Sequence, residues 1–201
     1  MTILVGKVAP DFIVPAVMPD GDIVESLNFS KHIAGKYALL FFYPLDFTFV
    51  CPTELVALNK RMEIFENKKI EVLAVSVDSV HTHNAWRNTE INQGGIGKIK
   101  YTLLSDVKHT VCRDYGVEHP EAGVAFRGAF MIDKTGVIRS QIVNDLPIGR
   151  SIDEVLRVFD AMQFHDEFGD VCPAGWQKGD EGMQENAKGV ATYLDRNSER
   201  L

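Results

Sequence analysis

Residues 37–43 read Tyr-Ala-Leu-Leu-Phe-Phe-Tyr, and residues 70–77 read Ile-Glu-Val-Leu-Ala-Val-Ser-Val. Each run is almost wholly apolar, which is typical of a strand that is buried on both faces of a sheet. From Pro52 onward, apolar side chains recur at spacings of three and four residues, which predicts one amphipathic helix that continues to Asn67. These side chains are Leu55, Leu58, Met62 and Phe65. A strand, a helix and a strand in this order indicate a right-handed parallel crossover.

The segments around this unit add antiparallel elements. Residues 126–132 and 137–143, joined by Asp133-Lys-Thr-Gly136, predict a hairpin at the edge of the sheet. Residues 1–30 favour an extended segment with a turn, and Ser151 with Glu154 forms a capping box before a helix. Further elements are expected as helices near 83–90, 107–115 and 185–195 and a strand near 102–104. The fold class is therefore α/β, with parallel crossovers and an antiparallel edge.

The composition of the chain changes near its end. Residues 165–201 hold four basic and eight acidic residues, together with a proline and several glycines. We therefore divide the chain into a domain over residues 1–164 and a C-terminal arm over residues 165–201.

Composition narrows the class of function. The 201 residues are 45% hydrophobic and 24% charged, which is ordinary for a globular protein. With 21 basic and 28 acidic residues the net charge is −7, which argues against nucleic acid or an anionic membrane surface as the partner. No stretch approaches the roughly 20 apolar residues of a membrane span, and the N-terminus lacks the pattern of a signal peptide. We expect a cytoplasmic protein with neither nucleic-acid nor membrane partners.

The three cysteines, Cys51, Cys112 and Cys172, are too few for a secreted disulfide framework and form no CxxC pair. The histidines show no HExxH motif, so we expect neither a metal ion nor another cofactor, and we place His81 and His83 in a surface loop or helix start. Nothing beside Cys112 except Arg113 is electropositive, so Cys112 is assigned no catalytic role.

Cys51 stands where the first buried strand gives way to the amphipathic helix. Pro52 suits the first turn of a helix, and Glu54 suits the positive end of the helix dipole. A cysteine at a helix N-terminus is favoured as a thiolate, and the carboxyl ends of parallel strands are where open sheets bind ligands. From its position alone, two interpretations of Cys51 remain: it is an inert thiol in the core, or it is a nucleophile whose substrate the position does not identify. The hydroxyl of Thr48 lies three residues before it.

Four blocks of the sequence resemble the peroxiredoxins of the typical two-cysteine class. Residues 47–54 read Phe-Thr-Phe-Val-Cys-Pro-Thr-Glu, similar to the active-site block of that family, and residues 170–176 read Asp-Val-Cys-Pro-Ala-Gly-Trp, similar to its resolving-cysteine block. Residues 126–133 and 145–151 resemble two further blocks, in the same order. The resemblance implies a thioredoxin-like fold with an N-terminal extension, followed by the C-terminal arm.

The resemblance also implies a role for each cysteine. Cys51 is expected to be the peroxidatic cysteine, which attacks a peroxide oxygen and becomes a sulfenic acid. Cys172 of the partner subunit is expected to resolve that sulfenic acid as an intersubunit disulfide.

Five further site residues follow from the same resemblance. Thr48 is expected to hydrogen-bond the peroxide, Pro44 to shield the sulfenate from water, and Arg127 to hold the thiolate and polarise the oxygens. Arg127 lies in an apolar run, where an arginine needs a nearby anion. Glu54 and Arg150 are expected to orient Arg127.

The implied function is a thiol-dependent peroxidase that reduces hydrogen peroxide and organic hydroperoxides, and that thioredoxin or an AhpF-like reductase regenerates. A homodimer that associates into a decamer is expected. A disulfide reductase would need CxxC at Cys51 and is excluded, whereas a holdase chaperone remains a second role. Gly94-Gly-Ile-Gly97 resembles the family's overoxidation-sensitive loop, but Tyr193-Leu194 replaces its Tyr-Phe partner, so intermediate sensitivity is expected.

Overall fold

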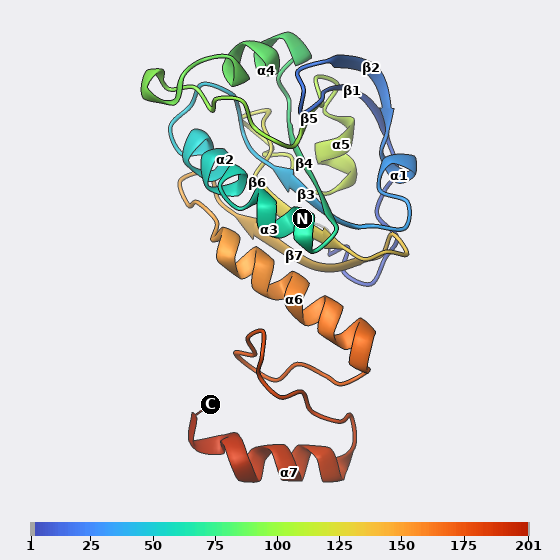
Figure 1. Ribbon diagram of the computed structural model, residues 1–201. Helices are drawn as coiled ribbons and strands as arrows, with labels where there is room; N and C mark the ends of the chain where they lie inside the picture. The colour runs from blue at the N-terminus through green and yellow to red at the C-terminus, as the bar shows by residue number, and fades with distance from the viewer. Residues whose placement is uncertain (1–2, 201) are drawn as a thin grey trace. The chain divides into compact units, whose positions relative to one another are not determined.

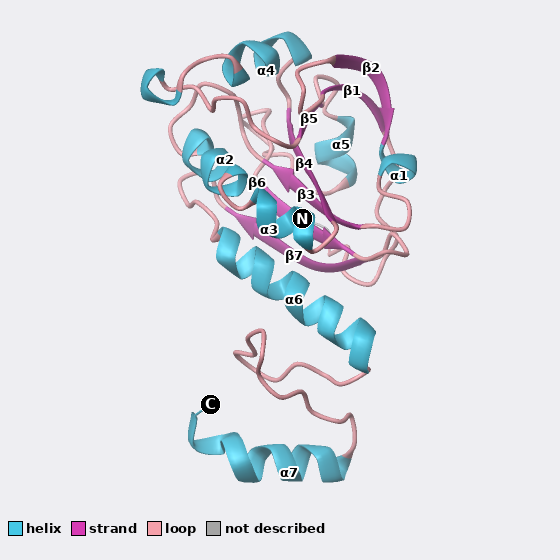
Figure 2. Ribbon diagram, viewed as in Figure 1, coloured by secondary structure: helices cyan, strands magenta, loops and turns pink. Residues whose placement is uncertain are grey.

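The computed structural model describes residues 3–200 and contains one mixed sheet of seven strands (Figures 1 and 2). Its strands lie in the order β2-β1-β5-β4-β3-β6-β7. The strands are β1 (Ile13–Val17), β2 (Ile23–Asn28), β3 (Tyr37–Phe42), β4 (Ile70–Ser76), β5 (Thr102–Ser105), β6 (Arg127–Ile132) and β7 (Ile138–Asn144). The helices are α1 (Phe29–His32), α2 (Cys51–Asn59), α3 (Met62–Asn67), α4 (Val80–Arg87), α5 (Thr110–Asp114), α6 (Ile152–Phe168) and α7 (Ala187–Asn197), with short 3-10 turns η1 (Ile91–Gln93) and η2 (Ser198–Arg200).

The central strands confirm the predicted crossover. β3 pairs with β4 in parallel, and β4 pairs with β5 in parallel. β6 pairs antiparallel with β3, and β7 completes the predicted hairpin at one edge. Every residue of β3 is buried, because helices cover both faces of the sheet there.

Successive side chains of β3 point to opposite faces of the sheet, and this separates two environments. On one face, the Phe41 ring lies 3.3 Å from the Arg150 guanidinium carbon. On the other face, the Phe42 ring packs 5.3 Å from Tyr115, in a core that also includes Phe29 of α1 and Val111 of α5. The two faces therefore hold different chemistry, charged on one side and aromatic on the other.

Three helices differ from the sequence expectation. The single helix predicted to Asn67 is two helices, α2 and α3. Between them the Arg61 amide donates to the Leu58 carbonyl, three residues back, and the Asn59 side chain accepts a hydrogen bond from the Lys100 backbone (2.9 Å). α4 begins at Val80 because Ser79 caps it by accepting from the Thr82 amide. α5 begins only at Thr110. The four apolar residues predicted for the helical face are buried, as expected.

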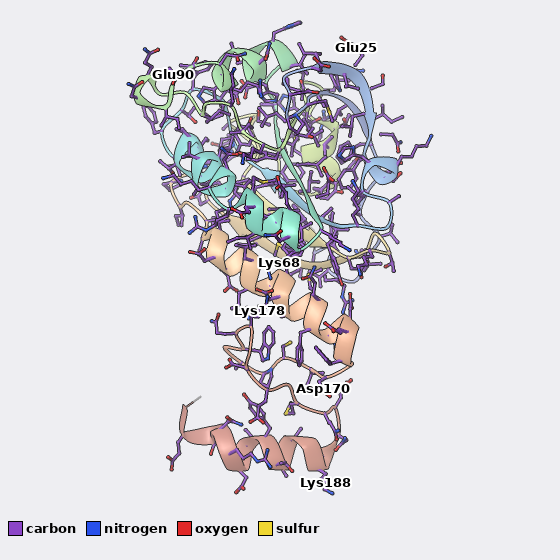
Figure 3. All side chains as sticks on the ribbon, in the orientation of Figure 1. Glu25, Lys68, Glu90, Asp170, Lys178 and Lys188 are labelled. Carbon is purple, nitrogen blue, oxygen red and sulfur yellow. The ribbon has the colours of Figure 1, made fainter. Side chains whose placement is uncertain are left out.

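The chain forms two compact units, residues 1–152 and 153–201. The expected boundary after residue 164 lies inside α6 and stays a prediction. Exposed charged side chains cover the first unit, as Figure 3 shows for Glu25 and Glu90. In the second unit α7 begins at Asn186, whose side chain accepts from the Gly189 amide. No helix in the described part of the chain is long and apolar enough to cross a membrane.

Candidate active site

Cys51 is the first residue of α2, directly after the loop that leaves β3. Pro52 occupies the first turn, as predicted, and no side chain caps the helix at Val50. The dipole of this helix end favours negative charge at Cys51. Its side chain is fully buried, so the immediate neighbours of the sulfur decide its chemistry.

Arg127 provides the first of these neighbours. It is the first residue of β6, and its Nη1 lies 3.5 Å from the Cys51 Sγ and 2.8 Å from Glu54 Oε2. Its Nε donates to the Leu146 carbonyl at 2.6 Å, which fixes the plane of the guanidinium. A fixed arginine beside a buried thiol stabilises a thiolate, and it also stabilises charge that moves onto an oxygen attacked by that thiolate.

Glu54 and Arg150 hold this arginine in place. The backbone amide (2.7 Å) and Nε (2.9 Å) of Arg150 both donate to Glu54 Oε1. The Nη2 of Arg150 donates to Glu54 Oε2 (3.0 Å). Arg150 Nη1 donates to the Gly128 carbonyl at 2.6 Å, one residue after Arg127. Glu54 therefore accepts hydrogen bonds from both Arg127 and Arg150, and these bonds, with those to the Leu146 and Gly128 carbonyls, fix the orientation of the two guanidinium groups.

The electrostatics of this group agree with its geometry. Burial raises the pKa of Glu54, but the hydrogen bonds and charge of Arg150, with the charge of Arg127, outweigh burial and hold that pKa below its ordinary value. Burial lowers the pKa of Arg150, and Glu54 opposes the shift. The site thus holds an ionised carboxylate between two cations, within contact of Cys51.

Pro44 and Thr48 lie on the loop between β3 and Cys51. Pro44 is buried, and Thr48 is partly buried. The Thr48 hydroxyl donates to the Leu45 carbonyl at 2.8 Å, which leaves its oxygen lone pairs able to accept a hydrogen bond from a bound molecule. Phe47 has φ of 52°, and Phe49 is 93% exposed, so the loop exposes two aromatic rings.

A buried polar network anchors this loop, and the sequence analysis missed it. His83 Nδ1 lies 2.7 Å from Asp46 Oδ2, and its Nε2 lies 3.1 Å from the Leu104 carbonyl. Tyr43 donates to Asp46 Oδ1 at 2.7 Å. Burial raises the pKa of Asp46, although the hydrogen bond with His83 opposes it. Of the two positions expected for His83, the helix start is the one found, in the first half of α4, and the surface loop is wrong, because the side chain is fully buried.

Trp86 packs beside the same loop. Its ring centre lies 5.8 Å from that of Phe47 and 6.0 Å from that of Tyr43. Its Nε1 donates to the Gly94 carbonyl at 2.9 Å, which connects the active-site loop to the glycine-rich segment.

Cys172 lies in the second unit, partly buried, and its Sγ is 3.6 Å from the Ala161 carbonyl. Burial raises the pKa of Cys172, and the charge of Arg157 opposes this rise. Arg157 pairs with Glu154 at 2.7 and 2.8 Å and donates to the Trp176 carbonyl at 3.0 Å, so it ties α6 to the segment around Cys172.

Cys112 lies apart from the Cys51 site, in the core that α5 shares with Phe42. Burial and the nearby Asp106 raise its pKa to about 12, so it is a poor nucleophile at neutral pH.

The fold thus brings four of the expected site residues into contact: Cys51, Glu54, Arg127 and Arg150. Pro44 and Thr48 lie on the adjoining loop, and Cys172 lies in the other unit.

Comparison with known proteins connects this site to a family. The model of the AhpC/TSA family matches residues 5–141, and that of the C-terminal domain of 1-Cys peroxiredoxin matches residues 161–196. Alkyl hydroperoxide reductase C of Helicobacter pylori is 48% identical over 98% of this chain and 100% of its own length. Peroxiredoxin-1 of Gallus gallus is 46% identical over 96% of each chain. The reduced 2-Cys peroxiredoxin of Plasmodium vivax has a TM-score of 0.93 at 47% identity, over 96% of this chain and 100% of its own.

Proposed function

Because the chain belongs to the AhpC/TSA family of peroxiredoxins, whose activity is thiol-dependent reduction of peroxides, we propose that Cys51 is its peroxidatic cysteine. The observation that carries this proposal is the contact of Arg127 with both the Cys51 sulfur (3.5 Å) and Glu54 (2.8 Å) at an uncapped helix start. At Cys112, burial and Asp106 outweigh the charge of Arg113 and raise the pKa of the thiol.

The first step is nucleophilic attack on the peroxide. The Cys51 thiolate attacks the terminal oxygen, the O–O bond breaks, and the leaving oxygen takes a proton and departs as water or an alcohol. Arg127 stabilises the charge as it moves from sulfur to oxygen, while Glu54 and Arg150 orient it. Thr48 accepts a hydrogen bond from the peroxide hydroxyl through its free lone pairs, and Pro44 shields the resulting sulfenic acid.

The second step resolves the sulfenic acid. Cys172 of the partner subunit attacks the Cys51 sulfur, an S–S bond forms, and water leaves. A dithiol reductase such as thioredoxin or an AhpF-like protein then supplies two electrons and two protons and restores both thiols. We place this cycle in the cytoplasm, where disulfides are transient and such reductants regenerate them.

The cycle requires at least a homodimer, and we propose that dimers assemble into a decamer. The exposed rings of Phe47 (51%) and Phe49 (93%) on the active-site loop support self-association, because exposed aromatic patches mark interaction surfaces. A holdase role of the assembly would not depend on Cys51. Suppression of aggregation that persists in Cys51→Ser would therefore identify it as a separate function.

One experiment tests the peroxidase cycle. One equivalent of hydrogen peroxide is added to the reduced protein, followed by a non-reducing gel and peptide mass spectrometry. We expect a covalent dimer joined through Cys51 and Cys172, absent in Cys51→Ser and Cys172→Ser and retained in the matched control Cys112→Ser. A monomer with oxidised Cys51 and intact Cys172 would contradict the resolving role. Unreacted Cys51 would contradict the peroxidatic role.

A further inference from the structure

A group of three different metal-binding side chains lies around the start of α5. Among residues 3–200, His109, Cys112 and Glu118 form the one set whose donor atoms, an imidazole nitrogen, a sulfur and a carboxylate oxygen, all lie within 4.8 Å of one another. His109 stands three residues before Cys112, a spacing that a search for CxxC and HExxH motifs does not detect. The peroxidase cycle proposed above uses none of the three.

We propose that His109, Cys112 and Glu118 bind one Zn²⁺ ion, with water as the fourth ligand. Thiolate, imidazole and carboxylate are the ligand types of protein zinc sites, whereas Mg²⁺ and Ca²⁺ take oxygen donors. Binding involves no redox change: the Cys112 thiol, which stays protonated in the metal-free protein, loses its proton to solvent as the ion binds, and the sulfur donates to the metal. This proposal revises the expectation that the chain binds no metal.

The distances between the donors suit a tetrahedral ion. Zinc–ligand bonds of ordinary length separate two ligands in a tetrahedron by roughly 3.3–3.6 Å. His109 Nδ1 already lies 3.0 Å from Glu118 Oε1. The Cys112 sulfur lies within 4.8 Å of both of these atoms. A side-chain shift of about 1 Å therefore brings all three donors to bonding distance of one ion.

Neighbouring groups hold the donors in place. The carboxylate of Asp106 accepts from the backbone amides of Val111 (3.1 Å) and Cys112 (2.8 Å), which fixes the first turn of α5. Arg113 Nε lies 3.6 Å from Glu118 Oε2, so Oε1 is left toward His109. Such outer contacts are those that orient metal ligands.

The three donors differ in burial, so the site is both partly enclosed and accessible to an ion from solvent. Cys112 is buried, whereas the side chains of His109 and Glu118 are each 29% exposed. The sulfur therefore lies at the floor of the site, and the other two donors lie at its rim. An ion from solvent meets the rim donors first and then reaches the thiol.

Cobalt(II) is the probe that tests this site, because its colour reports thiolate ligation and tetrahedral geometry. The full chain carries Cys51→Ser and Cys172→Ser, so that Cys112 is the remaining thiol. We expect one Co²⁺ per chain, a thiolate-to-cobalt charge-transfer band and tetrahedral d–d bands, all displaced by Zn²⁺ and unaffected by Mg²⁺. The thermal unfolding midpoint of the same protein rises with added Zn²⁺.

Substitutions of the three proposed ligands, made in the Cys51→Ser, Cys172→Ser protein, test whether all three bind the ion. His109→Asn suits the left-handed backbone of residue 109 (φ 58°), and Glu118→Gln keeps its size; each weakens metal affinity at least ~10-fold. Cys112→Ser removes the charge-transfer band. The matched control His119→Asn, next to Glu118 but outside the group, leaves affinity unchanged. Absence of the band in the folded background protein overturns the proposal, as does equal affinity in His109→Asn and Glu118→Gln, which means that cobalt is held by the cysteine alone.

Discussion

At the scale of single residues, Arg127 makes the contact on which the proposed chemistry depends. It touches the Cys51 sulfur and the Glu54 carboxylate with one nitrogen and the Leu146 carbonyl with another. Lysine cannot reproduce this geometry, because an ammonium group lacks the planar set of donors.

We therefore predict that Arg127→Gln slows reaction with hydrogen peroxide by about 10²–10³-fold, the loss found when a preorganised donor to a transition state is removed. Arg127→Lys recovers part of that rate through its charge. Stopped-flow measurement of Cys51 oxidation gives both rates. Arg139→Gln, on the neighbouring strand β7, serves as the control and stays within about twofold of the wild type. An Arg127→Gln rate equal to that of the control would show that the contact has no part in catalysis.

Glu54 carries the second prediction at this scale. Glu54→Gln leaves two buried guanidinium groups without their carboxylate, which costs about 3–5 kcal/mol of the free energy of unfolding at neutral pH. Urea unfolding measures this loss. The control is Glu63→Gln, an exposed residue of the first turn of α3, which stays within about 0.5 kcal/mol.

The same carboxylate sets a pH dependence. The pKa of folded Glu54 lies below its ordinary value of 4.5, so its stabilisation is complete above that value and is lost as pH falls through the folded-state pKa. Wild-type stability therefore falls in acid more steeply than that of Glu54→Gln. Parallel curves would contradict the ion-pair assignment.

At the scale of elements, the sequence predicted what depends on local pattern. Continuous apolar runs predicted β3 and β4, and the strand-to-helix junction placed Cys51 at the start of α2. The break after Asn59 was not predicted, because neither proline nor glycine marks it in the sequence and the Asn59 side chain is bonded to Lys100, far along the chain. The burial of His83 was not predicted because its partners Asp46 and Leu104 come from two distant segments.

The segment after α4 carries the prediction at this scale. A side chain at Gly95 would overlap the Thr89 carbonyl, so Gly95→Ala forces the turn apart and costs about 1–3 kcal/mol. Gly94 is the matched control: its φ is 82° and the space around it is open, so Gly94→Asn is tolerated. Urea unfolding of both variants compares them. Equal stability of the two would mean that the turn relaxes without cost.

At the scale of the whole molecule, the residues that contact Cys51 could be singled out from the sequence, but the proposed self-association depends on surfaces that only the fold identifies. Phe49 is part of the recognised active-site block, yet nothing in the sequence indicates that its ring is 93% exposed. Such a ring is typical of an anchor in an interface between copies of the chain.

Phe49→Ser is predicted to weaken self-association by roughly 30-fold, the effect of losing an aromatic anchor worth about 2 kcal/mol. Sedimentation velocity over a range of concentrations detects the shift to smaller species. Val107→Ser, also exposed and apolar but next to α5, leaves the distribution unchanged. Identical distributions for Phe49→Ser and the wild type would exclude the active-site loop from the interface.

The balance of charge at Cys51 has a consequence for how the protein behaves in different salts. Arg127 and Arg150 face one carboxylate, Glu54, so the charges of this group balance only while Cys51 is a thiolate. When the Cys51 sulfur is uncharged, one guanidinium charge is left unmatched, and a desolvated guanidinium attracts small anions more strongly than one in water does. In the proposed cycle, chloride and larger anions would therefore compete with the peroxide for Arg127, so that turnover would depend on the identity of a buffer's anion as well as on its ionic strength.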